Sequence, residues 1–277
     1  GAGTGELAAD ILDGLKAGAG PPDLYLILEP GPTLRERQRT LLEARHPDLI
    51  DRVHWIDRLP PAFSGVLVAN EVMDALPVHR FQVRADGAIA EMLVRPLADG
   101  WEEVAADPVS PGLVEAVRAL HAQGLARAPG YASEINMRLG PWIRALAGSL
   151  TRGLMLLIDY GYARADYYRP ERAMGTLMCH HRHRAHGDPY VHLGLQDITA
   201  HVDFSAVAAA GRGAGLEVAG FATQAHFLIG CGFESLLAER IQGKAGLDVL
   251  PGAKQLVSPL GMGEVFRVLG LAKGIHH

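Results

Sequence analysis

The sequence opens on a glycine-rich turn, Gly1-Ala2-Gly3-Thr4-Gly5, which is followed at once by a helical pattern over residues 6–16. An apolar strand over residues 24–28 comes next and ends at Glu29. Glycines let the backbone turn sharply and approach a ligand closely, and a helix N-terminus presents unpaired amides at the same place. An acidic residue after the next strand suits both hydroxyls of a ribose. This order predicts half of a nucleotide-binding α/β unit, although an ordinary strand-turn-helix corner uses similar glycines.

A unit of this kind has a further strand directly before its glycine turn. No such strand is present here, because the turn begins at Gly1. We therefore expect the sequence to begin inside a longer protein, whose preceding segment contributes part of the site.

Composition excludes several classes of protein. The net charge of −5 opposes non-specific binding to nucleic acid, which needs an excess of Lys and Arg. Two cysteines, Cys179 and Cys231, provide no disulfide framework and fit a reducing compartment. Apolar runs all fall short of the roughly 18 residues that a membrane-spanning helix requires. We expect neither a nucleic-acid partner nor a membrane span.

Apolar runs alternate with helical patterns, which predicts a parallel sheet wrapped by helices. A capping-box pattern, Thr33-Leu34-Arg35-Glu36, predicts the start of the second helix. The further strands are expected over residues 53–56, 65–69, 154–158, 217–223 and 265–271.

A segment of different character interrupts this alternation after the strand expected over residues 65–69. Three strand-like runs, over residues 81–83, 88–94 and 101–104, are separated by the turns Asp86-Gly87 and Asp99-Gly100, which predicts a β-meander. Two helices are expected to follow, over residues 113–126 and 134–149. We therefore predict a cofactor domain of residues 1–78 and 151–277, and an inserted substrate-side subdomain of residues 79–150.

The strongest local motif is Asn70-Glu71-Val72-Met73-Asp74-Ala75-Leu76-Pro77-Val78. Its polar residues lie directly beyond an apolar strand, where ligands bind in open α/β sheets. Glu71 and Asp74, three residues apart, are placed to point the same way from one turn. The alternative is that either carboxylate only caps the next element.

A second cluster, residues 196–204, contains His201 and Asp203 just before a predicted helix over residues 204–211. Asp203 suits the N-cap of that helix. His201 has apolar neighbours and carboxylates on both sides, so it is a candidate proton acceptor or ligand contact.

A histidine run, Cys179-His180-His181-Arg182-His183-Arg184-Ala185-His186, invites a zinc site. Its spacing does not match a tetrahedral site, and its arginines oppose a cation. We therefore expect no metal and a polar loop near the cofactor or substrate entrance. The sequence also lacks the Gly-x-Ser-x-Gly turn of hydrolases and the Gly-x-x-x-x-Gly-Lys-Ser/Thr loop of nucleotide hydrolases.

Several segments together resemble the MidA-like methyltransferase family. In chain order they are the glycine turn, Asn70-Glu71-Val72-Met73-Asp74-Ala75-Leu76-Pro77, Tyr131-Ala132-Ser133-Glu134, Asp159-Tyr160-Gly161, Gln196-Asp197-Ile198-Thr199-Ala200-His201-Val202-Asp203-Phe204 and Met262-Gly263-Glu264. The resemblance runs over nearly the whole chain. The Asn-Glu-x-x-Asp-Ala-Leu-Pro and Gln-Asp-Ile-Thr-x-His-Val-Asp blocks carry most of it, because a glycine loop alone is common.

The resemblance implies a class I methyltransferase with a Rossmann-like α/β sheet and S-adenosylmethionine as cofactor. Gly1, Gly3 and Gly5 would then lie near the methionine end of the cofactor, Glu29 near its ribose and Asp57 near its adenine. We also assign Asn70, directly after the strand expected over residues 65–69, to the cofactor.

The mitochondrial members of this family are complex I assembly factors that methylate an arginine of a complex I core subunit. The resemblance therefore implies a protein substrate of this kind, in a bacterial cytoplasm or a mitochondrial matrix. Glu71 and Asp74 would bracket the guanidinium, and His201 or Asp203 would provide a second route for its proton.

Two other functions remain open from the residues. A nicotinamide-dependent dehydrogenase would also use Glu29 for a ribose, but it expects a glycine where Glu6 stands. A non-catalytic assembly protein could keep a methyltransferase fold as a binding surface, because fold does not determine function.

Overall fold

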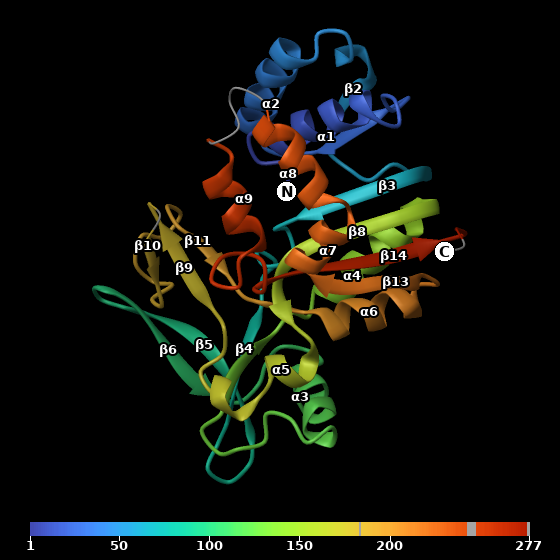
Figure 1. Cartoon of the computed structure of the whole chain (residues 1–277). Coiled ribbons are helices and arrows are strands. Elements are labelled where there is room, and N and C mark those ends of the chain that lie inside the picture. The colour runs from blue at the N-terminus through green and yellow to red at the C-terminus, as the bar shows by residue number, and fades with distance from the viewer. Residues whose placement is uncertain (183, 243–247, 276–277) are drawn as a thin grey trace. The chain divides into compact units, whose positions relative to one another are not determined.

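The computed structural model describes residues 1–182, 184–242 and 248–275, and it divides into two compact units (Figure 1). The smaller unit comprises residues 1–64 and 148–151, and the larger unit comprises residues 65–147 and 152–277. In the described part of the chain, every helix is too short or too polar to cross a membrane. The predicted division at residues 78 and 151 stays a prediction.

The smaller unit packs helices against a parallel pair of strands. Its elements in chain order are α1 (Glu6–Ala17), β1 (Tyr25–Leu28), α2 (Pro32–Arg45), the 3-10 helix η1 (Ile50–Arg52) and β2 (Val53–Ile56). The strands align with Leu26 opposite His54. Side chains from both helices and both strands form its core, namely Ala8, Ala9, Leu12, Ile27, Leu42, Leu49 and Val53. The apolar spacing of α1 is therefore explained by one buried face.

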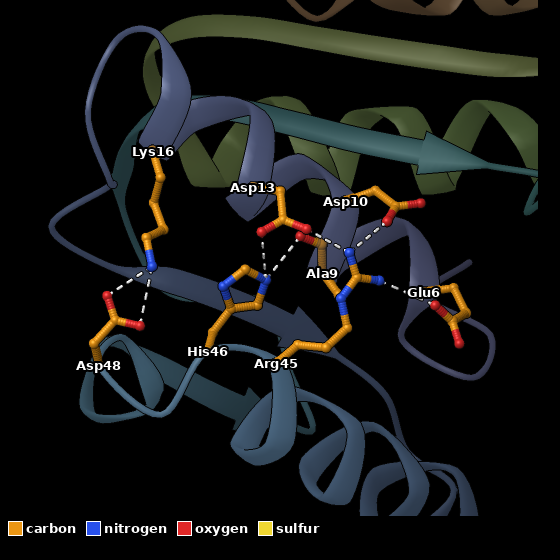
Figure 2. A network of polar contacts seen from close by, with 8 residues as sticks. All are labelled: Glu6, Ala9, Asp10, Asp13, Lys16, Arg45, His46 and Asp48. Carbon is orange, nitrogen blue, oxygen red and sulfur yellow. Dashed lines mark hydrogen bonds and ion pairs between the residues drawn. The ribbon is translucent and has the colours of Figure 1, made fainter. Parts of the chain in front are cut away.

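A polar network joins α1 to the end of α2 (Figure 2). Arg45 contacts the carboxylates of Glu6, Asp10 and Asp13, which recur along one side of α1. Exposed pairs of this kind contribute little individually. The buried His46 ring is placed more firmly, since its Nε2 lies 2.9 Å from the carbonyl oxygen of Ala9. Together these contacts fix the position of α1 and of the glycine turn at its N-terminus.

The predicted capping box at Thr33 is wrong. Helix α2 begins at Pro32, its N-cap is Gly31, and no side chain caps it. Proline suits the first helical position, because it has no N–H to satisfy and its φ angle is already helical. The carboxylate of Glu29 accepts a hydrogen bond of 2.8 Å from the amide of Gly31, just before the helix.

The central sheet is mixed, whereas the sequence patterns predicted a parallel sheet. The order is β12-β8-β14-β13, with β3 also paired to β8. Its strands are β3 (Phe63–Asn70), β8 (Leu150–Tyr162), β12 (Val202–Asp203), β13 (Glu217–Thr223) and β14 (Phe266–Lys273). Strand β12 runs parallel to β8, but β14 runs antiparallel to both of its neighbours. A continuous apolar run marks a buried strand without revealing its direction.

Helices of the larger unit pack on this sheet, as α6 does on β13 and β14 (Figure 1). The helices after β8 are α5 (Arg164–Tyr167), η2 (Pro170–Arg172), α6 (Phe204–Gly213), α7 (Gln224–Gly230), α8 (Phe233–Gln242) and α9 (Leu250–Val257). Helix α6 lies so close to β14 that a Cβ atom on Gly211 would be 2.9 Å from the Leu271 side chain. The α/β fold class predicted from the sequence is thus present.

The inserted segment forms a separate antiparallel sheet with the order β6-β5-β4-β7. Its elements are β4 (His79–Val83), β5 (Ile89–Leu97), β6 (Gly100–Ala106), α3 (Leu113–Ala122), β7 (Ala132–Ile135) and α4 (Leu139–Ser149). The three predicted meander strands are present as β4, β5 and β6. The turns fall where the two Asp-Gly pairs predicted them.

The helix predicted over residues 134–149 is present as α4, but its predicted start is wrong, because Glu134 belongs to β7 and α4 begins only at Leu139. The Glu134 carboxylate is buried, and it accepts hydrogen bonds from the Thr176 amide at 2.7 Å and the Tyr167 hydroxyl at 2.9 Å. These partners lie 42 and 33 residues away in sequence, so no local pattern revealed them.

The polar loop predicted over the histidine run is also wrong, because most of it is β-structure. Strands β9 (Met178–His181), β10 (Arg184–His186) and β11 (Asp197–Thr199) form a small antiparallel sheet with the order β10-β9-β11. The fully buried Cys179 anchors β9. His183 of the same run, and the closing His276 and His277, lie outside the described residues.

Candidate functional site

The glycine turn has the backbone that the sequence predicted. Gly3 and Gly5 have φ angles of 51° and 99°, and Gly5 is the N-cap of α1 without any side-chain cap. A Cβ atom on Gly5 would lie 3.2 Å from the Cα atom of Gln38, whereas one on Gly3 would meet no atom within 4 Å. Glycine is therefore favoured at position 5 by the positive φ angle and by close packing, and Gly3 leaves open space beside an uncapped helix N-terminus that attracts anionic groups.

Gln38, which no sequence motif indicated, connects the parts of this corner. Its side chain is fully buried and donates to the carbonyl oxygen of Gly3 at 2.8 Å and to the Glu29 carboxylate at 3.4 Å. The Trp55 indole donates to its Oε1 at 2.9 Å. A signal was present, since Leu34, Gln38 and Leu42 share one face of α2. A polar residue inside an apolar stripe marks a buried hydrogen-bonding site.

We expect Gln38→Ala to weaken the binding of S-adenosylhomocysteine about tenfold, because a buried carbonyl and a carboxylate lose their shared donor. Isothermal titration calorimetry measures this, with Arg37→Ala on the exposed side of α2 as the control. Unchanged affinity in Gln38→Ala, whatever its thermal stability, would show that the residue only supports packing.

The contacts of the other predicted cofactor residues do not by themselves assign them to a cofactor. Asp57 is exposed and pairs with Arg58 at 3.6 Å. Gly1 is exposed, and Asn70 donates to the Glu71 carboxylate at 3.1 Å. Gly1 and Asp57 belong to the smaller unit and Asn70 to the larger unit. Their roles toward a cofactor stay predictions.

The motif after β3 forms a tight turn that treats its two carboxylates differently. Glu71 is exposed and has a φ angle of 49°, which is strained for a residue with a side chain. Its amide donates to the carbonyl oxygen of Ile158, within β8, at 2.9 Å. Asp74, in contrast, is only 6% exposed. The expectation that both would point the same way from one turn stays a prediction.

Asp159, for which the sequence motifs predicted no role, holds this turn from β8. Its fully buried carboxylate accepts hydrogen bonds from the amides of Met73 at 3.0 Å, Asp74 at 3.3 Å and Tyr160 at 3.0 Å. Burial, followed by the nearby charge of Asp74, raises the pKa of Asp159 to about 7. The group is therefore a carboxyl that exchanges a proton near neutral pH.

Tyr160 completes the support by donating its hydroxyl to Asp74 Oδ2. Burial and this bond raise the pKa of Tyr160, so it stays a donor at physiological pH. The other oxygen, Asp74 Oδ1, is buried and has no hydrogen-bond partner among the described residues. A buried carboxylate oxygen without a donor is costly, so this atom suits a cationic or N–H ligand.

His201 lies beside the same tyrosine. Its ring is 5.3 Å from that of Tyr160 and 5.2 Å from that of Tyr162, and its amide donates to Thr176 Oγ1 at 2.9 Å. Burial, and then the charge of Arg172, lower the pKa of His201 to about 4. Its buried Nδ1 has no partner within the described ranges. The structure thus brings His201 and Asp74 together around Tyr160.

Asp203 has a structural position. Its Oδ1 accepts the Ala206 amide at 3.0 Å as the N-cap of α6, and its Oδ2 accepts from Arg164 Nε at 2.9 Å. The capping role considered for it is confirmed. Because both oxygens are engaged, a role for Asp203 in proton transfer stays a prediction without added support.

One histidine of the run stacks on a histidine that follows the run. The rings of His181 and His192 stack with centroids 4.2 Å apart, and His181 Nδ1 lies 2.8 Å from the carbonyl oxygen of Leu195. Among the residues that the structure describes, no three His, Cys, Asp or Glu side chains are grouped to hold a metal ion.

Asp159 and His201 predict opposite dependences of stability on pH. Folded Asp159 keeps a proton that the unfolded chain releases near 3.8, so its contribution falls as pH rises from about 4 to about 7. Folded His201 stays neutral where the unfolded histidine binds a proton, so its contribution rises with pH from about 4 to 6.5.

Urea unfolding across this range should separate the two contributions. Relative to the unmodified chain, Asp159→Asn should make the free energy of unfolding rise more steeply with pH, by at most about 1.4 kcal/mol per unit. His201→Gln should make it fall more steeply. Parallel curves for all three proteins would contradict both assignments.

Comparison with known proteins agrees with this geometry. A family model described as "Putative S-adenosyl-L-methionine-dependent methyltransferase" matches residues 1–222. The chain belongs to this methyltransferase family. The nicotinamide-dependent alternative is set aside, and the predicted cofactor is the one that the family description names.

Two solved structures from Burkholderia thailandensis are similar to this family member over its whole length. One, described as a "likely methyl transferase" bound to S-adenosyl-homocysteine, is 40% identical with a TM-score of 0.93, and 71% of it is covered. The other, described as uncharacterized, is 41% identical with a TM-score of 0.92, and 73% of it is covered.

Two curated relatives are more distant. The Drosophila melanogaster protein named "Protein arginine methyltransferase NDUFAF7 homolog, mitochondrial" is 29% identical over 81% of this chain and 51% of its own length. The Danio rerio protein arginine methyltransferase NDUFAF7, also named mitochondrial, is 27% identical over 96% of this chain and 66% of its own. The chain thus spans about half to two thirds of the curated relatives that it matches.

Proposed function

We propose that this chain is the core of an S-adenosylmethionine-dependent methyltransferase that modifies an arginine side chain of a protein. The observation that carries the proposal is Asp74, a buried carboxylate with one oxygen held by Tyr160 and the other without a partner among the described residues. A protonated guanidinium offers N–H donors and positive charge, which such an oxygen requires.

The smaller unit suits the cofactor. The open space beside Gly3 and the uncapped N-terminus of α1 fit a methionine carboxylate, and Glu29, held by Gly31 and Gln38, fits the ribose hydroxyls. When bound, S-adenosylmethionine supplies a methyl group on a positively charged sulfur. All other steps belong to the side chains of the protein.

In the larger unit, Asp74 and Glu71 draw positive charge toward the bound edge of the guanidinium. This leaves electron density on the nitrogen that attacks, and it orients that nitrogen for in-line transfer. A new carbon–nitrogen bond forms as the carbon–sulfur bond breaks. The methylated nitrogen then loses a proton. His201 Nδ1 is a candidate acceptor, because burial lowers the pKa of His201 to about 4 and so keeps the ring neutral, and this nitrogen has no hydrogen-bond partner among the described residues.

The names of the curated relatives support arginine as the acceptor and mitochondria as one compartment. We propose a core subunit of respiratory complex I as the substrate, in the mitochondrial matrix of eukaryotes or the cytoplasm of bacteria. This part of the proposal rests on the family resemblance and not on the Asp74 site, which would accept other nitrogen cations.

The proposal is tested by incubating the full-length protein with labelled S-adenosylmethionine and the purified complex I core subunit of the same organism. We expect label on the subunit and methylarginine in its peptides by mass spectrometry. Label on another residue type would refute arginine. Tight cofactor binding without transfer to this subunit or to complex I preparations would favour the assembly-protein alternative.

A further inference from the structure

Besides the Asp74 site, the larger unit contains an open cavity of about 400 Å³. It lies between the inserted sheet and the small β10-β9-β11 sheet, which run side by side in Figure 1. Its walls come from β4, β5 and β6 on one side, and from the segment around β9 and β11 on the other. The cavity is therefore built by two small antiparallel sheets that are separate from the central sheet.

The surface of this cavity is apolar and exposed to water. Four of its lining side chains, Val94, Trp101, Leu193 and Ile198, are each 43–54% exposed. A cluster of large exposed apolar side chains is unusual for an unliganded surface and is typical of an interaction site.

The charges in the cavity wall already have partners. Arg80 and Glu103 pair at 2.5 Å, and Glu91 accepts from the amides of Val109 and Ser110 and lies 3.4 Å from His79. The Nε atom of Arg80 is buried without a hydrogen-bond partner among the described residues, but the charge of that guanidinium is already paired with Glu103. A ligand that brings its own charge would therefore find no opposite charge to pair with and would lose its hydration. The wall favours an uncharged aliphatic or aromatic side chain.

Residues that line the cavity are close in sequence to residues of the Asp74 site. Val78 and His79, at one end of the lining, follow Asp74 by only four and five residues. On the opposite wall, Leu177 directly follows Thr176, whose Oγ1 accepts the His201 amide, and Ile198 precedes His201 by three residues. A peptide with its arginine at Asp74 would therefore have its neighbouring residues within reach of this cavity.

We infer that the cavity binds an apolar side chain of the substrate, a few residues from the methylated arginine, and so selects the sequence around it. This inference rests on the proposed function. Its occupant is an extended protein segment, and a second copy of this chain is the competing occupant that the experiment separates.

The test uses fluorescein-labelled arginine peptides that differ only in having Phe or Asp at one flanking position, titrated by anisotropy with S-adenosylhomocysteine present. At one position we expect the Phe peptide to bind about tenfold more tightly, the effect of burying one large apolar side chain. Leu193→Glu and Val94→Glu should abolish the preference. Leu260→Glu should retain it, because that leucine is fully exposed and lies outside the cavity.

Several outcomes would overturn the inference: no preference at any position, no peptide binding, or a preference that survives both cavity variants. Dissociation of a dimer by Leu193→Glu in sedimentation experiments would assign the cavity to a second copy instead. Methylation of the same peptides separates the two proposals. Selective binding without methyl transfer would refute the proposed function alone, and transfer without flanking preference would refute the cavity alone.

Discussion

Asp74→Asn should lower the rate of methyl transfer at least about a hundredfold while leaving the affinity for S-adenosylhomocysteine unchanged. The substitution keeps the shape of the side chain but removes the charge that would stabilise a cationic acceptor, and losses of this size follow removal of one electrostatic contact in other enzymes. Single-turnover transfer from labelled cofactor to the complex I subunit measures the rate. Calorimetry measures the affinity.

Related variants rank the contributions of this cluster. Tyr160→Phe removes only the hydroxyl that orients Asp74, so we expect a loss of about tenfold that does not change the cofactor affinity. Glu71→Gln should have an intermediate effect, because that carboxylate is exposed. Asp99→Asn, at an exposed turn, serves as the matched control.

A full rate in Asp74→Asn would refute the proposed role of this carboxylate. A fall in cofactor affinity that matches the fall in rate would instead assign Asp74 to the cofactor. Equal and severe losses in Asp74→Asn and Asp99→Asn would indicate that the assay reports general stability.

Gly161→Ala should be the most destabilising single-atom change at this site, at about 3 kcal/mol. A Cβ atom at Gly161 would lie 2.2 Å from the carbonyl oxygen of Val202, its partner in the parallel pairing of β8 with β12. Because the obstacle is backbone, the clash is relieved only by displacing β12, which directly follows His201.

Chemical denaturation measures this loss, with Gly187→Ala as the control, since a Cβ atom there would meet nothing within 4 Å. Displacement of β12 should also expose His201 and raise its pKa from about 4 toward the ordinary 6.5, which NMR titration detects. Equal stability of Gly161→Ala and the unmodified chain would disprove the close approach of the two strands.

Features that depend on residues close in sequence could be predicted, whereas contacts between distant segments could not. Residues close in sequence allowed the glycine turn, α1, β2, β13 and the meander turns to be predicted, because their signals are glycine conformations and side-chain periodicities within a few residues. The motif around Asp74 was found for the same reason. Its polar residues follow an apolar strand directly.

The sequence alone therefore determined the fold class, the glycine corner with Glu29, and Asp74 and His201 as candidates. Only the tertiary structure decided that Asp159 and Tyr160 hold Asp74, across 85 and 86 residues of sequence, and that Gln38 supports the glycine turn from 35 residues away. It also placed Glu134 in a strand and made β14 antiparallel. The physical reason is that a buried hydrogen bond depends on which segments meet after folding, and spacing within one segment carries no record of a partner in another.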